Sequence, residues 1–311
     1  MLVPVLADEL RIRSRYRSAV GGDGSSTGAV LVTGATSGIG LAFARAYAAR
    51  GCPLVLVARD RARLTEVAAQ LRDSGSPEVE VLAADLSTAD GLAAVCTRVG
   101  DRDRPVDVLV NNAGFGTGRR FIGSDLEAEL RLLDVLARAV LAVTHAAVPG
   151  MLERGRGRVV TVASVAAFLP GGSYTAAKAW AVAFTRGLAY ELAYASAGAR
   201  DGAGMRDGAG NRDGAGSGVT ATAVCPGFVR TDFHRRAKLD LKLPALFWLD
   251  ADELVAAALR DVDRGRPVSV PTVRYRVVAA VLRHLPVRPV DALSIRRSAR
   301  RSIRRAGRRT R

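Results

Sequence analysis

The strongest constraint on the fold of this chain is a regular alternation of short apolar runs with segments of helical periodicity, which begins at Ala29. The runs are almost continuous in Val, Leu and Ala, as is typical of strands that helices cover on both faces. They span residues 29–33, 53–58, 79–84, 106–111, 158–163, 219–224 and 267–270. Strands that alternate with helices are joined by right-handed crossovers and pair in parallel. The sequence therefore predicts an α/β fold, a doubly wound parallel sheet of about seven strands with helices on both faces.

The composition around this core divides the 311 residues into one large domain and its appendages. We expect the domain to span residues 28–290, with a flexible basic arm at 1–27 and an arginine-rich tail at 291–311. Residues 198–218 contain Arg-Asp-Gly-Ala-Gly three times at a period of six. This repeat has no large apolar group whose burial would offset its ordering entropy, so we expect a mobile low-complexity insertion.

The same sequence argues against membrane-spanning, secreted and metal-binding proteins. No apolar run approaches the 18 residues that cross a bilayer, and the start MLVPVLADEL lacks the features of a signal peptide, so we expect a cytoplasmic protein. The three cysteines lie far apart, and the histidines (His145, His234 and His284) have no metal-ligand spacing. We therefore expect neither a disulfide framework nor a metal site.

A glycine-rich turn follows the first predicted strand directly. It places Gly34, Gly38 and Gly40 at Gly-x-x-x-Gly-x-Gly spacing, and a helical segment comes next. Glycines in a strand-to-helix turn let the backbone approach a pyrophosphate, which then lies at the positive N-terminus of the helix. Together with Ser37 and Ile39, this turn predicts a dinucleotide site on a Rossmann-like sheet.

The end of the second predicted strand indicates which dinucleotide is preferred. An NAD site has a carboxylate about twenty residues beyond the turn, where it binds the ribose 2′-hydroxyl. This chain has Ala58 and then Arg59, whose guanidinium can pair with a 2′-phosphate. We therefore predict that NADP(H) is preferred, with NAD(H) as the alternative cofactor. The competing interpretation is that Arg59 is an ordinary solvated arginine.

Tyr174 and Lys178 stand four residues apart in a segment of helical pattern, so both project from one helix face. An ammonium beside a phenol favours the phenolate, and we therefore expect Lys178 to lower the pKa of Tyr174 from about 10. Ser164 follows the fifth predicted strand. By itself, a serine at a strand end commonly caps backbone groups.

These motifs, in this order, resemble the classical short-chain dehydrogenase/reductase family over about residues 28–290. Other matching positions are Asp85, Leu86, Asn112, Ala113, Gly114, Pro226, Gly227 and Thr231. The resemblance implies that Asp85 contacts the adenine and that Ala113 and Gly114 line its ribose pocket. The nicotinamide end would lie against Pro226, Gly227 and Thr231. It also implies a homo-dimer or tetramer that acts on a small-molecule carbonyl or alcohol.

A catalytic group of Ser164, Tyr174 and Lys178 is implied by the same resemblance. In the family, hydride passes between the nicotinamide and the carbonyl carbon while the tyrosine donates a proton to the carbonyl oxygen. The serine hydrogen-bonds that oxygen, and the lysine also grips the nicotinamide ribose.

Two features depart from the family pattern. The interval of ten residues from Ser164 to Tyr174 is short, so we expect a tight intervening loop. Leu136 stands where the family usually supplies an Asn that supports a water-mediated proton relay to the lysine.

We predict an oxidoreductase that interconverts a carbonyl and a secondary alcohol. The alternative is an NADP-binding scaffold or sensor with impaired catalysis, localised by its basic tail.

The segment after Thr231 is expected to cover the substrate. Its apolar residues are Leu239, Leu241, Leu243, Leu246, Phe247 and Trp248, and its bases are Arg235, Arg236, Lys238 and Lys242. An apolar wall with nearby cations would suit a lipophilic or acyl-type substrate. The equally weighted alternative is a lid that packs on its own core.

The formal net charge of +16 is concentrated at the C-terminal end, because residues 296–311 hold nine arginines and no acid. Before them, apolar residues at 277, 278, 281, 282 and 285 predict one apolar face of an amphipathic helix. We expect that face to pack on the domain or on a second subunit, and the tail to be solvated. The alternative is peripheral contact of residues 275–311 with an anionic membrane; nucleic acid is not expected as a partner.

Overall fold

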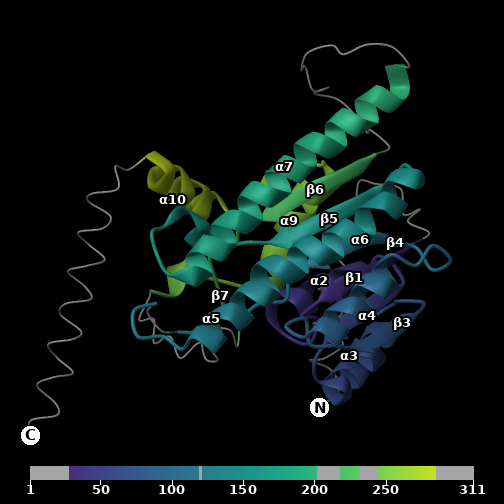
Figure 1. Cartoon of the computed structure of the whole chain (residues 1–311), viewed down its shortest axis with the longest axis horizontal. Coiled ribbons are helices and arrows are strands. Elements are labelled where there is room, and N and C mark those ends of the chain that lie inside the picture. The colour runs from purple at the N-terminus through teal and green to yellow at the C-terminus, as the bar shows by residue number, and fades with distance from the viewer. Residues whose placement is uncertain (1–27, 119–120, 202–217, 232–243, 285–311) are drawn as a thin grey trace, which may run out of the picture.

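The computed structural model describes residues 28–118, 121–201, 218–231 and 244–284. Its centre is a seven-stranded sheet of order β3-β2-β1-β4-β5-β6-β9 in which every neighbouring pair is parallel (Figure 1). The strands are β1 (Ala29–Thr33), β2 (Leu54–Ala58), β3 (Val79–Ala83), β4 (Val106–Asn111), β5 (Gly157–Val162), β6 (Val219–Val224) and β9 (Val268–Ser269). The predicted doubly wound α/β sheet is confirmed.

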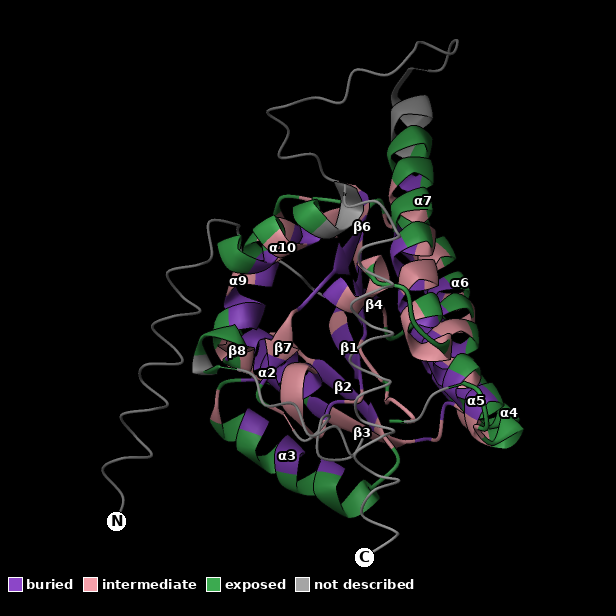
Figure 2. Ribbon diagram, turned by 90° about the vertical axis from the view of Figure 1, so that its left-hand side faces the viewer, coloured by how far each residue is buried: buried purple, intermediate pink, exposed green. Residues whose placement is uncertain are grey.

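Helices cover both faces of this sheet. One layer contains α2 (Gly38–Ala48), α3 (Arg61–Asp73), α9 (Ala251–Asp263) and α10 (Val273–His284). The other contains α4 (Ala89–Val99), α5 (Leu126–Leu133), the π-helical turn η1 (Asp134–Arg138), α6 (Ala139–Glu153) and α7 (Ser173–Asp201). Figure 2 shows the buried strands between the two layers. Each face therefore has its own apolar core, which explains why the strands are apolar throughout.

Side-chain caps mark where several helices begin. The carboxylate of Asp60 accepts from the backbone N–H of Arg63 at the start of α3, and the hydroxyl of Thr88 accepts from Gly91 at the start of α4. Asp125 and Asp250 cap α5 and α9 in the same way. These caps satisfy first-turn amides that otherwise have no partner in the helix, so they fix the points at which the loops end.

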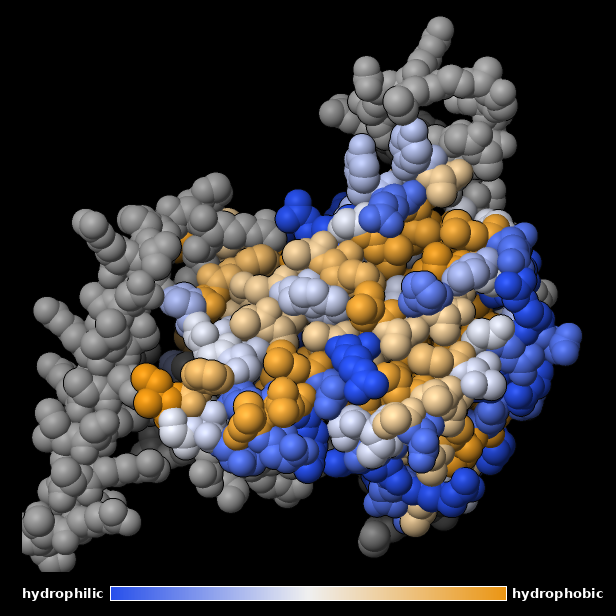
Figure 3. Space-filling view, in the orientation of Figure 1, coloured by the Kyte–Doolittle hydropathy of each residue, from blue (hydrophilic) through white to orange (hydrophobic). Residues whose placement is uncertain are grey.

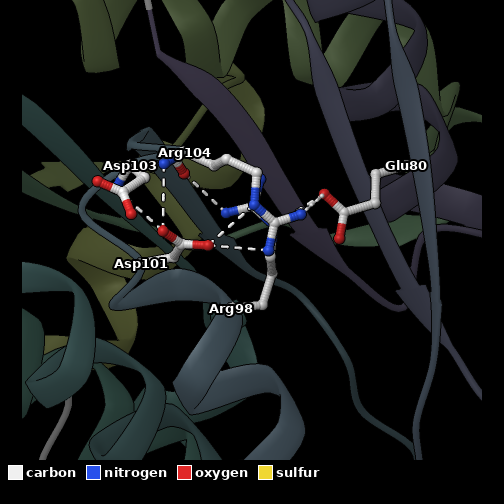
Figure 4. A network of polar contacts seen from close by, with 5 residues as sticks. All are labelled: Glu80, Arg98, Asp101, Asp103 and Arg104. Carbon is white, nitrogen blue, oxygen red and sulfur yellow. Dashed lines mark hydrogen bonds and ion pairs between the residues drawn. The ribbon is translucent and has the colours of Figure 1, made fainter.

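Buried ion pairs tie the strand ends to neighbouring elements. Asp107 on β4 accepts from the N–H of Gly28 and from the guanidinium groups of Arg154 and Arg156, at 3.0–3.3 Å. In a second network, the guanidinium of Arg98 on α4 donates to the Glu80 carboxylate of β3 at 2.8 Å and to the carbonyl oxygen of Arg104 (Figure 4). These contacts fasten the C-terminal end of α4, and the loop that follows it, to the edge strand β3.

The long helical stretch Leu126–Glu153, formed by α5, η1 and α6, differs from the sequence expectation. By length and composition alone it is apolar enough to cross a membrane, although no comparable run was expected. In the described fold, however, 44% of its most apolar 18-residue window is buried. Val143, Ala147 and Met151 of this stretch pack in the core against the sheet. It is therefore a core helix of the domain.

Helix α7 extends into the first residues of the predicted low-complexity insertion. We expected the insertion to span residues 198–218, but α7 continues to Asp201. Alanines at alternate positions from 193 to 199 favour a helix enough to outweigh the cost of about 1 kcal/mol for Gly198. The remainder of the insertion at 202–217, the arm at 1–27 and the tail at 285–311 lie outside the described residues, as does most of the expected substrate cover at 232–243.

The predicted apolar face of the C-terminal helix is wrong in detail. In α10 Tyr275 and Ala279 are buried and the predicted Val278 packs beside them, whereas the predicted Val277 and Val281 are about half exposed on the outer side. The reason is that hydrogen bonds of the Tyr275 hydroxyl, to the N–H of Phe228 and the carbonyl oxygen of Phe247, orient the helix. As a result, α10 has apolar side chains on both faces.

Candidate active site

The order of the strands determines where a ligand can bind. The chain proceeds from β1 to β2 and β3 on one side, and returns to β4, β5 and β6 on the other, so the topological switch lies between β1 and β4. Open α/β sheets bind ligands outside the carboxyl ends of the strands at this switch. The glycine turn follows β1 and the Asn112–Gly114 segment follows β4, so both predicted motifs lie at this position.

The glycine turn has no room for side chains at its three glycines. Gly34 and Gly38 have φ angles of +67° and +57°, which favour glycine. A Cβ on Gly40 would lie 2.3 Å from both the Asn112 amide nitrogen and the Gly34 carbonyl oxygen. The side chain of Ser37 does not cap α2, and the first turn of α2 has no acidic residue. This positively polarised helix start, with no acidic residue in its first turn, fits a pyrophosphate.

Asn112 and Thr33 join the ends of β4 and β1. The Asn112 amide donates to the carbonyl oxygen of Thr33 at 2.9 Å, while the Thr33 hydroxyl accepts from the backbone N–H groups of Asn112 and Ala113, each at 3.0 Å. The side chain of Asn112 is therefore committed to shaping the turn. Its amide nitrogen therefore supports the glycine turn directly.

Two predicted cofactor residues lie together at the ends of β2 and β3. Burial raises the pKa of Asp85, but hydrogen bonds from the backbone N–H and the hydroxyl of Ser87 lower it. The nearby guanidinium groups of Arg59 and Arg131 lower it as well, and together these effects outweigh burial, so the pKa of Asp85 lies below its ordinary value. Arg59 is exposed and close enough to act on this carboxylate. Leu86 instead packs its side chain into the core on the α4 side.

The segment after β6 closes the other side of the glycine turn. A Cβ on Gly38 would lie 2.9 Å from the methyl group of Thr231, so Thr231 is in direct contact with this turn. Pro226 is buried and Gly227 is half-buried behind it. The structure therefore brings the predicted nicotinamide-end residues together with the predicted pyrophosphate turn, although they are separated by about 190 residues in the sequence.

Ser164 and Tyr174 are hydrogen-bonded to each other. The Ser164 hydroxyl also accepts from the backbone N–H of Ala166 at 3.1 Å and so caps the 3₁₀ turn η2 (Val165–Phe168). The capping interpretation of this serine is therefore confirmed, while its active-site role stays a prediction. Because η2 is a single compact turn, the expected tight loop before α7 is present, and it brings Tyr174 back to the end of β5.

Lys178 lies one turn after Tyr174 on α7 and is only 7% exposed. Its ammonium donates to the carbonyl oxygen of Val162 at 2.7 Å and lies 6.0 Å from the centre of the Tyr174 ring. Burial lowers the pKa of Lys178 to about 8. An amine with this pKa can exchange protons close to neutral pH.

The expected lowering of the Tyr174 pKa is wrong for this structure. Burial raises the pKa of Tyr174 to about 12, and the hydrogen bond with Ser164 opposes that rise only in part. Desolvation outweighs any attraction between the phenolate and the Lys178 ammonium, because an amine with a pKa of about 8 has lost its proton before the phenol ionises. Tyr174 is therefore held in its protonated form.

Leu136 lies in the π-helical turn η1 and faces this group. It is buried and packs with Leu132, Ala177 and Tyr174 in a small apolar cluster. A Cβ on Gly114 would lie 2.7 Å from a methyl group of Leu136 and 3.8 Å from the Lys178 nitrogen. The position where the family supplies an amide is thus occupied by a methyl-bearing side chain between Gly114 and the tyrosine.

Sequence reasoning missed Tyr275, whose ring lies against Gly227. It lies almost fifty residues beyond that glycine, and only its place in a helical pattern could be predicted from the sequence.

Within the described residues, no group of three or more His, Cys, Asp or Glu side chains is placed to hold a metal ion.

Comparison with known proteins decides the family. Residues 28–197 match the short chain dehydrogenase family model. The chain belongs to the short-chain dehydrogenase family. The predicted resemblance is confirmed, and with it the assignment of the protein to a family of oxidoreductases.

Three members show how far the similarity extends. An uncharacterized oxidoreductase of Staphylococcus saprophyticus is 30% identical over 257 residues, which are 80% of this chain and 96% of the relative. A 3-oxoacyl-acyl-carrier-protein reductase of Synechocystis is 33% identical over 206 residues, covering 65% of this chain and 74% of the relative. A short-chain dehydrogenase from Sphingobium yanoikuyae, solved in complex with NADPH, has a TM-score of 0.69 and 34% identity. The match covers 88% of this chain and 95% of that protein.

Proposed function

We propose that this short-chain dehydrogenase interconverts a carbonyl compound and a secondary alcohol, with NADP(H) as its preferred cofactor. The observation that carries the proposal is the hydrogen-bonded pair of Ser164 and Tyr174, which lies beside the buried Lys178. This group follows β5, two strands away from the glycine turn after β1 in a parallel sheet, so both lie at the carboxyl edge. That arrangement suits hydride transfer at the switch point.

The preference for NADP(H) rests on the end of β2. Ala58 has no carboxylate to bind a ribose 2′-hydroxyl, and the exposed guanidinium of Arg59 is available for a 2′-phosphate. The similar protein from Sphingobium yanoikuyae was solved with NADPH, which supports the same preference. The glycine turn, Asp85, Asn112 to Gly114, and the segment from Pro226 to Thr231 would hold the rest of the dinucleotide.

The roles of the chain's own groups follow from their protonation states. A nicotinamide dinucleotide, when bound, supplies or accepts the hydride. Tyr174 is protonated at neutral pH, so in the reduction its hydroxyl donates a proton to the substrate oxygen. Ser164, which is hydrogen-bonded to Tyr174, would hydrogen-bond that oxygen as well. Lys178, with a pKa near 8, holds positive charge beside the tyrosine and can return a proton to it.

A lipophilic or acyl-type substrate is supported by the surroundings of Tyr174. Phe121 and Leu169 are exposed near the start of α7, and Phe121 lies 3.9 Å from the position of a Cβ on Gly172. Exposed apolar side chains beside a polar catalytic group favour a ligand with an apolar body. The similarity to a 3-oxoacyl-acyl-carrier-protein reductase supports a ketoacyl compound within this class.

One observation favours the alternative of an NADP-binding scaffold or sensor. Leu136 places methyl groups, instead of an amide, beside Gly114 and Tyr174. A proton relay through this position would have to pass through water and backbone carbonyls alone. Intact Ser164, Tyr174 and Lys178 favour the enzyme over the scaffold.

The test of the proposed activity is the variant Tyr174→Phe, which removes one hydroxyl. We expect turnover to fall by about 10²–10⁴-fold, since that is the usual contribution of one positioned acid. NADPH binding and thermal stability should be almost unchanged. The measurement is NADPH oxidation with ketoacyl and other lipophilic ketones, alongside titration of NADPH and NADH.

Tyr190→Phe is the matched control, because Tyr190 is an exposed tyrosine on the same helix. Turnover that survives Tyr174→Phe unchanged would contradict the catalytic assignment. Tighter binding of NADH than of NADPH would contradict the cofactor preference. NADPH binding without turnover on any carbonyl or alcohol would favour the scaffold.

We also propose a homo-oligomer, a dimer or a tetramer, in the cytoplasm. Figure 3 shows apolar side chains gathered on the face formed by α5, α6 and α7. The exposed large residues there are Leu126, Leu130, Leu133, Leu141, Tyr190 and Tyr194. An apolar surface of this kind is typical of a subunit interface.

We also propose peripheral contact with an anionic membrane through residues 275–311. The exposed valines and arginines of α10 support this proposal.

A further inference from the structure

Tyr275 of α10 lies directly against the segment that follows β6. It is 3% exposed. A Cβ on Gly227 would lie 2.1–2.3 Å from three carbon atoms of the Tyr275 ring. Such a distance is far inside van der Waals contact, so the ring occupies the space that any other residue at position 227 would need. The aromatic ring and the glycine are therefore matched in shape.

The hydroxyl of Tyr275 connects two further backbone segments. It accepts from the N–H of Phe228 at 3.1 Å and donates to the carbonyl oxygen of Phe247 at 2.7 Å. The strands on either side of these groups, β7 (Phe228–Val229) and β8 (Trp248–Leu249), pair in parallel over only two residues. Because so short a ladder is weak by itself, the two hydrogen bonds of the hydroxyl add to the contacts that hold these segments together.

The same segment reaches the cofactor turn at its other end. Thr231 touches Gly38, and only two residues separate it from Phe228. The backbone from Pro226 to Thr231 is thus fixed by Tyr275 at one end and lies against the glycine turn at the other. If the first contact is loosened, the second loses its fixed position.

We propose that Tyr275 is a positioning residue, which holds the Pro226–Thr231 segment in the place where it receives the nicotinamide end of the dinucleotide. This inference rests on the proposed function, because that function assigns the nicotinamide end to this segment. Tyr275 acts through Gly227 and Phe228 and does not touch the cofactor itself. Without its hydroxyl, the segment would have to be ordered when the dinucleotide binds, and binding would be weaker by that cost.

The proposal predicts that Tyr275→Phe weakens one half of the dinucleotide only. The variant keeps the ring against Gly227 and removes both hydrogen bonds of the hydroxyl. We expect the Kd for NADPH to rise by about three- to tenfold, the size of one or two net hydrogen bonds. The Kd for adenosine 2′,5′-bisphosphate, which is the adenosine half of NADPH, should not change.

Tyr47→Phe is a matched control. Tyr47 is also a buried tyrosine, but its hydroxyl makes no hydrogen bond within the described residues. That variant should change neither Kd. Calorimetric titration of both ligands into the parent and the two variants gives the comparison directly.

The possible results separate the proposals. A selective loss of NADPH affinity in Tyr275→Phe supports the positioning role. An unchanged Kd for NADPH overturns it, and so does an equal loss for both ligands, since that result indicates general damage. A parent protein that binds neither NADPH nor NADH overturns the proposed function itself. The titrations of the parent are therefore done before any variant is compared with it.

Discussion

The buried amine of Lys178 makes stability depend on pH in a way that can be measured. Burial lowers its pKa from the ordinary value of 10.5 to about 8, so between these values the unfolded chain binds a proton that the folded chain does not. Stability should therefore rise with pH across this window, and below it the folded protein carries the full cost of a buried cation. The total change is about 3 kcal/mol, at about 1.4 kcal/mol for each unit of pKa.

The variant Lys178→Met tests this, because a methionine of similar length does not titrate. Near pH 7 the free energy of unfolding of the variant should exceed that of the parent by the largest amount. This difference should disappear as the pH rises from about 8 to 10.5. Urea unfolding of both proteins across that range supplies the measurement. A difference that stays constant with pH would show that Lys178 has an ordinary pKa in the fold.

The residues of the site differ in how far the sequence could predict them. Ser164, Tyr174 and Lys178 could be found because their spacing and order identify the motif. The pKa of Tyr174 could not, since its direction depends on burial, and burial is set by Leu132, Leu136 and Ala177 packing around the ring. A spacing of four residues fixes which side chains share a helix face and leaves their solvent exposure open.

At the scale of elements, Asp107 joins the start of β1 to the loop between α6 and β5. Its carboxylate is 5% exposed and accepts from Gly28, Arg154 and Arg156. Asp107→Asn keeps the shape but removes the charge, so we expect a loss of about 2–4 kcal/mol, as for other broken buried ion pairs. Glu66→Gln is the control, because its pair with Arg63 is exposed and should be worth less than about 1 kcal/mol. Equal losses in the two variants would contradict the buried role of Asp107.

The elements also show where prediction from sequence ends. All seven strands of the main sheet were predicted, because each is a continuous apolar run between helices. The pair β7 and β8 was not predicted: unlike β9, which lies in the predicted run 267–270, these two strands form a separate small pair, and tertiary contacts such as the hydrogen bonds of Tyr275 help to hold it. The prediction of which face of α10 packs inward failed for a similar reason. Two apolar faces are equivalent in a helical pattern, and the tertiary hydrogen bonds of Tyr275 determine which of them faces the core.

At the scale of the whole molecule, the positive charge and the outer face of α10 lie next to each other in the sequence. Val273, Val277 and Val281 recur every four residues on the exposed side, with Arg274 and Arg276 between them. The chain from 285 onward adds ten arginines and one aspartate. A second copy of the chain would bring a second positive tail to this face, whereas an anionic lipid surface complements both the valines and the charge.

We therefore expect the full-length protein to bind vesicles of phosphatidylcholine that contain phosphatidylserine, and to bind pure phosphatidylcholine vesicles much less. Each basic residue near such a surface contributes roughly 1 kcal/mol, and salt should weaken the attraction. Replacing the arginine pairs at 296/297, 300/301, 304/305 and 308/309 by glutamine should abolish the difference between the two vesicles, while NADPH binding persists. Val277→Ser with Val281→Ser should weaken binding to both vesicles, because it removes the apolar contribution only. Co-sedimentation of the three proteins distinguishes these effects. If the glutamine variant binds phosphatidylserine vesicles as well as the parent does, the charge of the tail is not what brings this protein to a membrane.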